Sequence, residues 1–77
     1  MNINVTILAG SWARRFMDED TAQITLKEGS NINDALTVLG IPPDETGLTV
    51  IDGKAVPRET ELRDGNRIRI FPVIVDG

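Results

Sequence analysis

Apolar and polar residues alternate in two segments near the start of the chain. In the first segment Ile3, Val5 and Ile7 share one face, and the residues between them are polar. Ile24 and Leu26 alternate in the same way in the second segment. A period of two that is rich in β-branched residues is typical of half-buried strands. We therefore predict two strands, antiparallel to each other and joined by a mobile surface loop.

The next segment has the pattern of a short helix. Ile32, Ala35, Leu36 and Leu39 recur at i, i+3, i+4 and i+7, so one face of the helix is apolar. The flanking residues are of the types that begin and end helices, namely Asn31, Asp34, Gly40, Pro42 and Pro43. A helix this short needs to pack on a sheet to be stable.

The segment "LTVIDGKAVP" predicts a hairpin. Asp52-Gly53 stands between two apolar runs and favours a type I′ turn, in which both central residues have positive φ. The following "RETELRDGN" contains turn-forming residues, and Leu62 is its one candidate core residue.

The last predicted strand lies in "RIRIFPVIV" and again alternates. Ile68 and Ile70 share one face, and Arg67, Arg69 and Phe71 share the other. The order of elements predicts an α+β fold, with a mixed sheet of four to five strands and one helix packed on one face. The second sheet face then stays uncovered and carries the two arginines and the phenylalanine of a central strand. This face is either a solvated sheet surface or a docking surface for a partner.

Composition excludes several classes of function. The 77 residues include no cysteine and no histidine, so the commonest metal ligands and the commonest general base are absent. The net charge of −4 argues against nucleic-acid binding through phosphate contacts. The segment "MNINVTILAG" has neither a basic region nor a long apolar run, so we expect no signal peptide, no membrane span and a cytoplasmic location. No catalytic motif, metal site or cofactor site is apparent, and we expect a protein that is not an enzyme.

The loop segment "SWARRFMDED" combines aromatic, basic and acidic residues. Trp12, Arg14, Arg15 and Phe16 either form a second contact patch or pack back on the domain. The acidic run at 18–20 has the character of a solvated loop.

Four phrases, in this order along the chain, resemble the ThiS/MoaD family of β-grasp sulfur carriers, which are relatives of ubiquitin. They are "NINDALTVLGIP", "VIDGKAVP", "ELRDGN" and "IRIFPV". The resemblance implies a β-grasp domain at 1–71 and an extended C-terminal tail at 72–77. Tails of this family end in Gly-Gly, whereas this chain ends in Asp76-Gly77.

The resemblance also implies a function. In such carriers an E1-like adenylating enzyme uses ATP to activate the terminal glycine carboxylate, and persulfide sulfur then displaces AMP to leave a thiocarboxylate. A sulfur-accepting synthase subunit takes the sulfur into a cofactor, and the "FPV" approach to the terminus favours the molybdopterin-type pathway over the thiamine-type pathway. The chain itself is then a substrate with no bound cofactor. Gly77 is the expected reactive terminus, Phe71, Arg67 and Arg69 form the expected docking face, and the expected tail residues are Pro72, Val73, Ile74, Val75 and Asp76.

Two properties of the tail bear on this function in opposite ways. Six extended residues beyond Phe71 span roughly 20 Å, enough for the tip to enter a pocket while the body docks outside it. Asp76, however, adds a β-carbon and a second negative charge near the reacting carboxylate, and an unpaired charge in a dry site is costly. Two alternatives therefore stay open. The chain is a non-conjugating β-grasp interaction module, or the functional terminus lies elsewhere.

Overall fold

The computed structural model describes residues 1–74, and its five strands form one mixed sheet. The strands are β1 (Asn2–Leu8), β2 (Thr21–Lys27), β3 (Thr46–Ile51), β4 (Lys54–Ala55) and β5 (Arg67–Pro72). Their order in the sheet is β2-β1-β5-β3-β4. β1 and β5 are parallel, and every other neighbouring pair is antiparallel. The last strand of the sequence is therefore the central strand of the sheet, as predicted.

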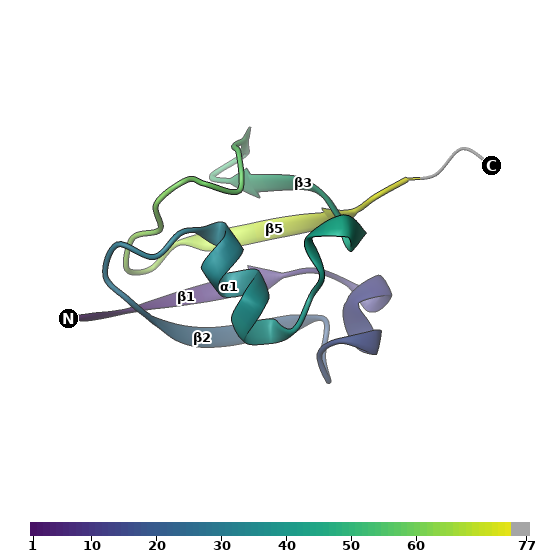
Figure 1. Cartoon of the computed structure of the whole chain (residues 1–77), viewed down its shortest axis with the longest axis horizontal. Helices are drawn as coiled ribbons and strands as arrows, with labels where there is room; N and C mark the ends of the chain where they lie inside the picture. The colour runs from purple at the N-terminus through teal and green to yellow at the C-terminus, as the bar shows by residue number, and fades with distance from the viewer. Residues whose placement is uncertain (75–77) are drawn as a thin grey trace.

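The helix α1 (Ile32–Leu39) crosses one face of this sheet (Figure 1). The predicted fold class, an α+β protein of β-grasp architecture with one helix on a five-stranded mixed sheet, is confirmed. Within residues 1–74, no helix has the length and the apolar character needed to cross a membrane.

The hydrophobic core lies between the helix and the sheet. The inward residues of β1, β5 and α1 are almost completely buried. They are Ile3, Val5, Ile7, Ile32, Ala35, Leu36, Ile68 and Ile70. Full burial of one valine, leucine or isoleucine side chain contributes about 1.5–3 kcal/mol, so burial at these positions is a major source of stability. The alternation predicted from the sequence is confirmed for β1 and β5.

Side-chain and backbone hydrogen bonds define both ends of α1. At the start, the Asp34 amide donates to Asn31 Oδ1 at 3.0 Å, and the Asn31 amide donates to Asp34 Oδ2 at 2.9 Å, which completes a capping box. At the end, Gly40 has a φ of 75°, and the Ile41 amide donates to Leu36 O at 3.0 Å. The predicted helix boundaries are confirmed.

The β3–β4 hairpin has the predicted turn. Asp52 and Gly53 have φ values of 53° and 79°, so both central residues are in the left-handed region that a type I′ turn requires. The buried Thr49 hydroxyl donates to the Val56 carbonyl at 2.6 Å and ties the outgoing segment to β3.

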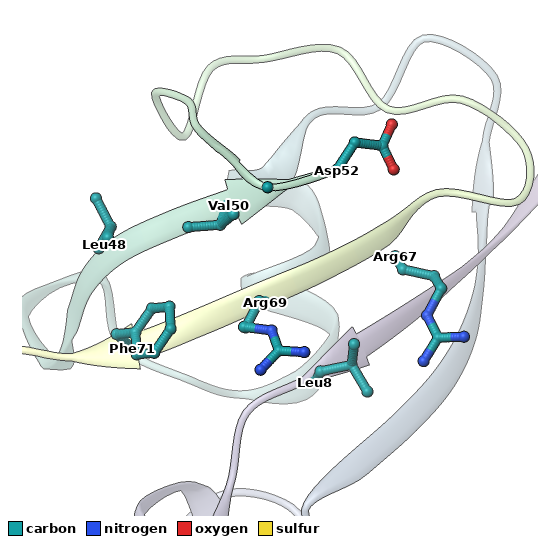
Figure 2. A pocket seen from close by; sticks show the side chains of 8 residues that line it. Leu8, Leu48, Val50, Asp52, Arg67, Arg69 and Phe71 are labelled. Carbon is teal, nitrogen blue, oxygen red and sulfur yellow. The ribbon is translucent and has the colours of Figure 1, made fainter.

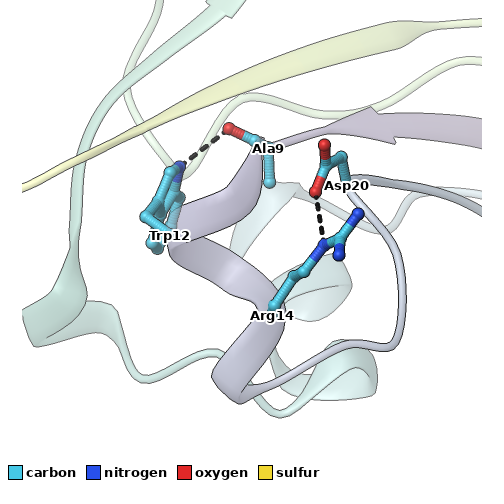
Figure 3. Close-up of polar contacts among 4 residues, drawn as sticks. All are labelled: Ala9, Trp12, Arg14 and Asp20. Atoms are coloured by element: carbon cyan, nitrogen blue, oxygen red, sulfur yellow. Dashed lines mark hydrogen bonds and ion pairs between the residues drawn. The ribbon is translucent and has the colours of Figure 1, made fainter.

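The connection between β1 and β2 is more structured than the mobile surface loop that was predicted. Ser11–Arg15 forms a short 3-10 helix, and Ala13 is completely buried. Trp12 Nε1 donates to the Ala9 carbonyl at 2.7 Å, and Arg14 Nε pairs with Asp20 Oδ1 at 2.9 Å (Figure 3). The loop was predicted because most of this stretch is polar. Its structure depends on Ala13 and Met17, which are both buried in the core. Of the two alternatives for this segment, the structure has the one in which its aromatic residue packs on the domain.

The segment between β4 and β5 lacks long regular elements but is anchored to the helix side. Leu62 is 1% exposed, and its amide donates to the Ser30 carbonyl at 2.8 Å. The prediction that Leu62 belongs to the core is confirmed.

Candidate functional site: the open sheet face and the tail root

Every second residue of the central strand β5 points outward, on the face opposite α1. Arg67, Arg69 and Phe71 are exposed, whereas the residues between them are buried. The strand register places Leu8 of β1 and Val50 of β3 on either side of Arg69. Residues directly opposite one another project from the same face of a sheet. Apolar side chains from both neighbouring strands therefore flank the arginine (Figure 2).

These residues surround an open hollow of about 630 Å³ on the sheet face. Its lining residues come from β1, β3, β5 and the hairpin turn, and they are Leu8, Leu48, Val50, Asp52, Gly53, Arg67, Arg69 and Phe71. We call this set the open face. Phe71 is 42% exposed and Leu48 is 50% exposed, although both are large apolar residues. Adjacent exposed apolar side chains bordered by charged residues are typical of a protein-binding surface.

The charge of the open face contrasts with that of the whole chain. The two ion pairs within residues 1–74 join Arg14 to Asp20 and Arg15 to Glu45, so the arginines of β5 take part in neither. The chain carries a net charge of −4, yet its open face presents two cations beside apolar groups. Asp52, from the hairpin turn, is the acidic residue of this lining. A partner with acidic and apolar groups is complementary to such a surface.

The tail begins at one end of the open face. β5 ends at Pro72, which has no amide hydrogen for further ladder pairing. The next residue still contacts the body, because the Val73 amide donates to the Glu45 carbonyl at 3.2 Å. From this point residues 73 and 74 lead away from the sheet, at the end opposite the N-terminus (Figure 1).

A second hollow, of about 440 Å³, lies at this position, which we call the tail root. Its lining is apolar and consists of Gly47, Leu48, Phe71, Pro72, Val73 and Ile74. Leu48 and Phe71 line both hollows, so the open face and the tail root form one continuous surface.

The structure thus brings several of the predicted site residues together. Phe71, Arg67 and Arg69 lie on one face, and Pro72, Val73 and Ile74 continue from it. Val75, Asp76 and Gly77 lie outside the described residues. The docking role, the reactive terminus and the domain boundary between 71 and 72 stay predictions.

Sequence reasoning missed the residues that neighbouring strands contribute to the site. Leu8 carried a signal, because it is an apolar residue on the polar face of an alternating strand. Leu48 and Val50 carried none, since their place beside β5 depends on the strand register. Glu45 and Gly47 likewise became recognisable only once β3 was placed against the end of β5.

Comparison with solved structures supports the same architecture. The putative molybdopterin converting factor, subunit 1, from Pyrococcus furiosus aligns with a TM-score of 0.76 at 18% identity, over 94% of this chain and 99% of that chain. Small archaeal modifier protein 1 from H. volcanii aligns with a TM-score of 0.75 at 15% identity, over 94% and 99% respectively. The Caldiarchaeum subterraneum ubiquitin aligns with a TM-score of 0.65 at 14% identity, over the whole of both chains. These identities establish a shared fold, and the predicted resemblance to ThiS/MoaD-type β-grasp proteins is confirmed at that level.

Comparison with curated protein sequences finds no significant match. The sequence model of the family described as Mut7-C ubiquitin, in contrast, matches residues 12–76. This match spans most of the chain, from the 3-10 helix after β1 into the C-terminal tail. The chain therefore belongs to the Mut7-C ubiquitin family.

Proposed function

We propose that this protein is a carrier that a partner enzyme activates at its C-terminal glycine. The observation that carries the proposal is that the tail root is continuous with the open face. The open face is partly apolar and holds two arginines that take part in neither ion pair of residues 1–74. One partner surface can then hold the open face while its active site receives the tail. The chain is a substrate, and the catalytic groups belong to the partner.

The proposed partner is an E1-like adenylating enzyme that uses ATP. A carboxylate oxygen of Gly77 attacks the α-phosphorus of ATP, pyrophosphate leaves, and an acyl adenylate forms. A persulfide sulfur then attacks the acyl carbon and AMP leaves. Reductive cleavage of the resulting acyl disulfide by a thiol yields the thiocarboxylate, and glycine obstructs neither attack because it has no side chain. A sulfur-accepting synthase subunit is the second proposed partner.

The structural relatives support two versions of this chemistry. Similarity to a putative molybdopterin converting factor subunit favours sulfur delivery to a molybdopterin-type synthase over delivery in thiamine synthesis. Similarity to a small archaeal modifier protein favours transfer of the activated carboxylate to an amine of another protein. Both versions share the adenylation step, and we therefore base the test on that step.

One sequence feature favours a second candidate function, a non-conjugating interaction module. Asp76 stands where sulfur carriers have glycine, and its carboxylate adds negative charge next to the reacting group. In this alternative the open face binds a partner and the tail carries no chemistry.

Mass spectrometry separates the two functions. The full chain is incubated with an E1-like adenylating enzyme and ATP, and we expect an acyl adenylate at Gly77. Addition of a sulfur donor should then give a chain whose mass exceeds the original by the replacement of one oxygen by sulfur. A chain that lacks Gly77 serves as the control and should gain nothing. Stable binding to the enzyme without any adenylate or thiocarboxylate would contradict the carrier and favour the module.

A further inference from the structure

The end of β5 and the start of β3 meet in an irregular pairing. Thr46 lies opposite Pro72 and Thr49 lies opposite Ile70, so two residues of β3 oppose the single residue Phe71. This arrangement is a β-bulge, which bends a strand and redirects its side chains. The two residues in question are Gly47 and Leu48, and the bulge thus belongs to both the open face and the tail root.

Gly47 permits an unusually close approach of the two backbones. A Cβ atom placed on Gly47 would lie 2.7 Å from the carbonyl oxygen of Pro72 and 3.3 Å from that of Phe71. The first distance is shorter than a non-bonded contact of this kind allows, and the obstacle is backbone rather than a flexible side chain. Any side chain at this position would therefore force β3 and the end of β5 apart.

Glu45 makes the second contact with the tail root. Its carbonyl accepts the Val73 amide at 3.2 Å, one residue beyond the end of β5. Glu45 ends the 3-10 helix Pro43–Glu45, where two consecutive prolines restrict the backbone. Arg58 further holds this turn, because its Nη1 donates to the Pro43 carbonyl at 2.8 Å. The carbonyl that receives the Val73 amide is therefore presented by a restrained segment.

From these contacts we propose that Glu45 and Gly47 are positioning residues that set the direction in which the tail leaves the body. We call their interaction with Pro72 and Val73 the tail-root contact. The contact itself is a feature of the structure, whereas its effect on the reaction rate at Gly77 rests on the proposed function. If the tail is aimed by this contact, the contact affects the rate of reaction at Gly77 more than the binding of the open face.

The side chain of Glu45 is secondary in this arrangement. It pairs with Arg15 at 3.0 Å, but both side chains remain largely exposed, at 44% and 66%. Exposed ion pairs of this kind contribute little because water and salt screen them. The tail-root contact thus consists of a backbone hydrogen bond and a close backbone approach, and Arg15→Ala should leave it intact.

The first test is Gly47→Ala, with Gly29→Ala as its control. Gly29 has a φ of 92° and no neighbour within 4 Å of an added Cβ, so its replacement strains a turn at the opposite end of the sheet and leaves the tail alone. We expect Gly47→Ala to accelerate amide hydrogen exchange of Val73 by about tenfold or more relative to Gly29→Ala, because opening of a local contact controls that exchange. Equal exchange rates of the Val73 amide in the two variants would overturn the proposal.

The second test separates rate from binding in the adenylation reaction. A misplacement of about 1 Å can cost up to a hundredfold in rate, so we expect Gly47→Ala to lower kcat about 10- to 100-fold. KM for the chain should change much less than kcat, because Arg67 and Arg69 lie earlier in β5 than the disturbed contact and stay on the open face. A raised KM with an unchanged kcat would contradict the proposal and assign Gly47 to docking.

A third variant keeps the test decisive if Gly47→Ala does not fold. Chemical synthesis can replace the amide between Pro72 and Val73 by an ester, which removes the hydrogen donated to Glu45 and keeps every side chain. This chain should show the same loss in kcat, and an unchanged kcat would overturn the role of the hydrogen bond. If the unmodified chain is not adenylated at all, the proposed function fails, while Val73 amide exchange still decides whether the tail-root contact exists.

Discussion

Two glycines near the site are required for different physical reasons. Gly53 has a φ of 79° and free space around an added Cβ, so the backbone conformation of the turn is what excludes other residues there. At Gly47 the limitation is space, because an added Cβ would meet the Pro72 carbonyl at 2.7 Å. Gly53 thus allows the backbone conformation of the hairpin turn, whereas Gly47 allows the end of β5 to lie close to β3.

At the same scale, Asp76 allows a direct test of the carrier function. We expect Asp76→Gly to increase the rate of adenylation about tenfold, equivalent to ~1.4 kcal/mol, because it removes a charge from the vicinity of the reacting carboxylate. Asp76→Asn removes the charge but keeps the β-carbon, so comparison of the two variants separates electrostatic from steric effects. The measurement is ATP–pyrophosphate exchange with the adenylating enzyme, and a slower reaction of the glycine variant would show that the aspartate makes a favourable contact.

Among the elements, the irregular segment between β4 and β5 has a larger structural role than its lack of regular structure indicates. Its amide at Leu62 donates to Ser30, and its carbonyl at Arg58 accepts the Asn33 amide at 3.1 Å. A bridge between Asn31 and Glu61 lies between these contacts. The segment therefore covers the start of α1 and completes the core at that end.

The corresponding prediction concerns Leu62, which is 1% exposed. Leu62→Ala should lower the free energy of unfolding by about 2–5 kcal/mol, because truncation of a buried leucine loses transfer free energy and leaves a cavity. Urea denaturation measures the change, with Val38→Ala as the control because Val38 is 59% exposed on the helix. The control should change the free energy of unfolding by less than about 0.5 kcal/mol. Equal destabilisation by both variants would contradict a core role for this segment.

Across the whole molecule, charge and apolar surface are distributed unevenly. The chain is acidic, but Arg67 and Arg69 lie together on the open face, outside the ion pairs described for residues 1–74. Leu48 and Phe71 on the same face expose large apolar side chains. One surface therefore combines electrostatic attraction for an acidic partner with apolar area to be buried, and the tail root adjoins it.

This distribution predicts where charge reversal affects recognition. Arg69→Glu should raise KM for adenylation about tenfold or more, equivalent to at least ~1.4 kcal/mol of binding. The rate of association should also decrease less steeply with rising ionic strength, because salt screens exposed charges and fewer attractive charges remain. KM and association rates at several salt concentrations are the measurements.

Lys27→Glu is the matched control for this charge reversal. Lys27 pairs with Asn2, whereas Arg69 pairs with Leu8, so the two cations lie six residues apart along β1, or roughly 20 Å. The control should change KM by less than about twofold. Equal effects of the two reversals would indicate that net charge, and not the open face, governs recognition.

Much of the fold could be predicted because the relevant signals are local. The alternation around Val5 and Ile70, the capping box of Asn31 and the Asp52-Gly53 turn each depend on residues a few positions apart. Their conformational preferences and their burial faces follow from short-range geometry alone. The segment after β1 was predicted less well, because the burial of Ala13 depends on contacts that are distant in sequence.

The amino-acid sequence by itself determined the strands and the helix α1, the caps of that helix, the hairpin turn and the two faces of the last strand. Only the tertiary structure decided that Leu8 and Val50 flank Arg69, and that Gly47 lies against Pro72. The reason is that a parallel pairing and a β-bulge join residues from separate parts of the chain. A one-residue shift in strand register would turn each of these side chains to the opposite face, and no local pattern specifies that register.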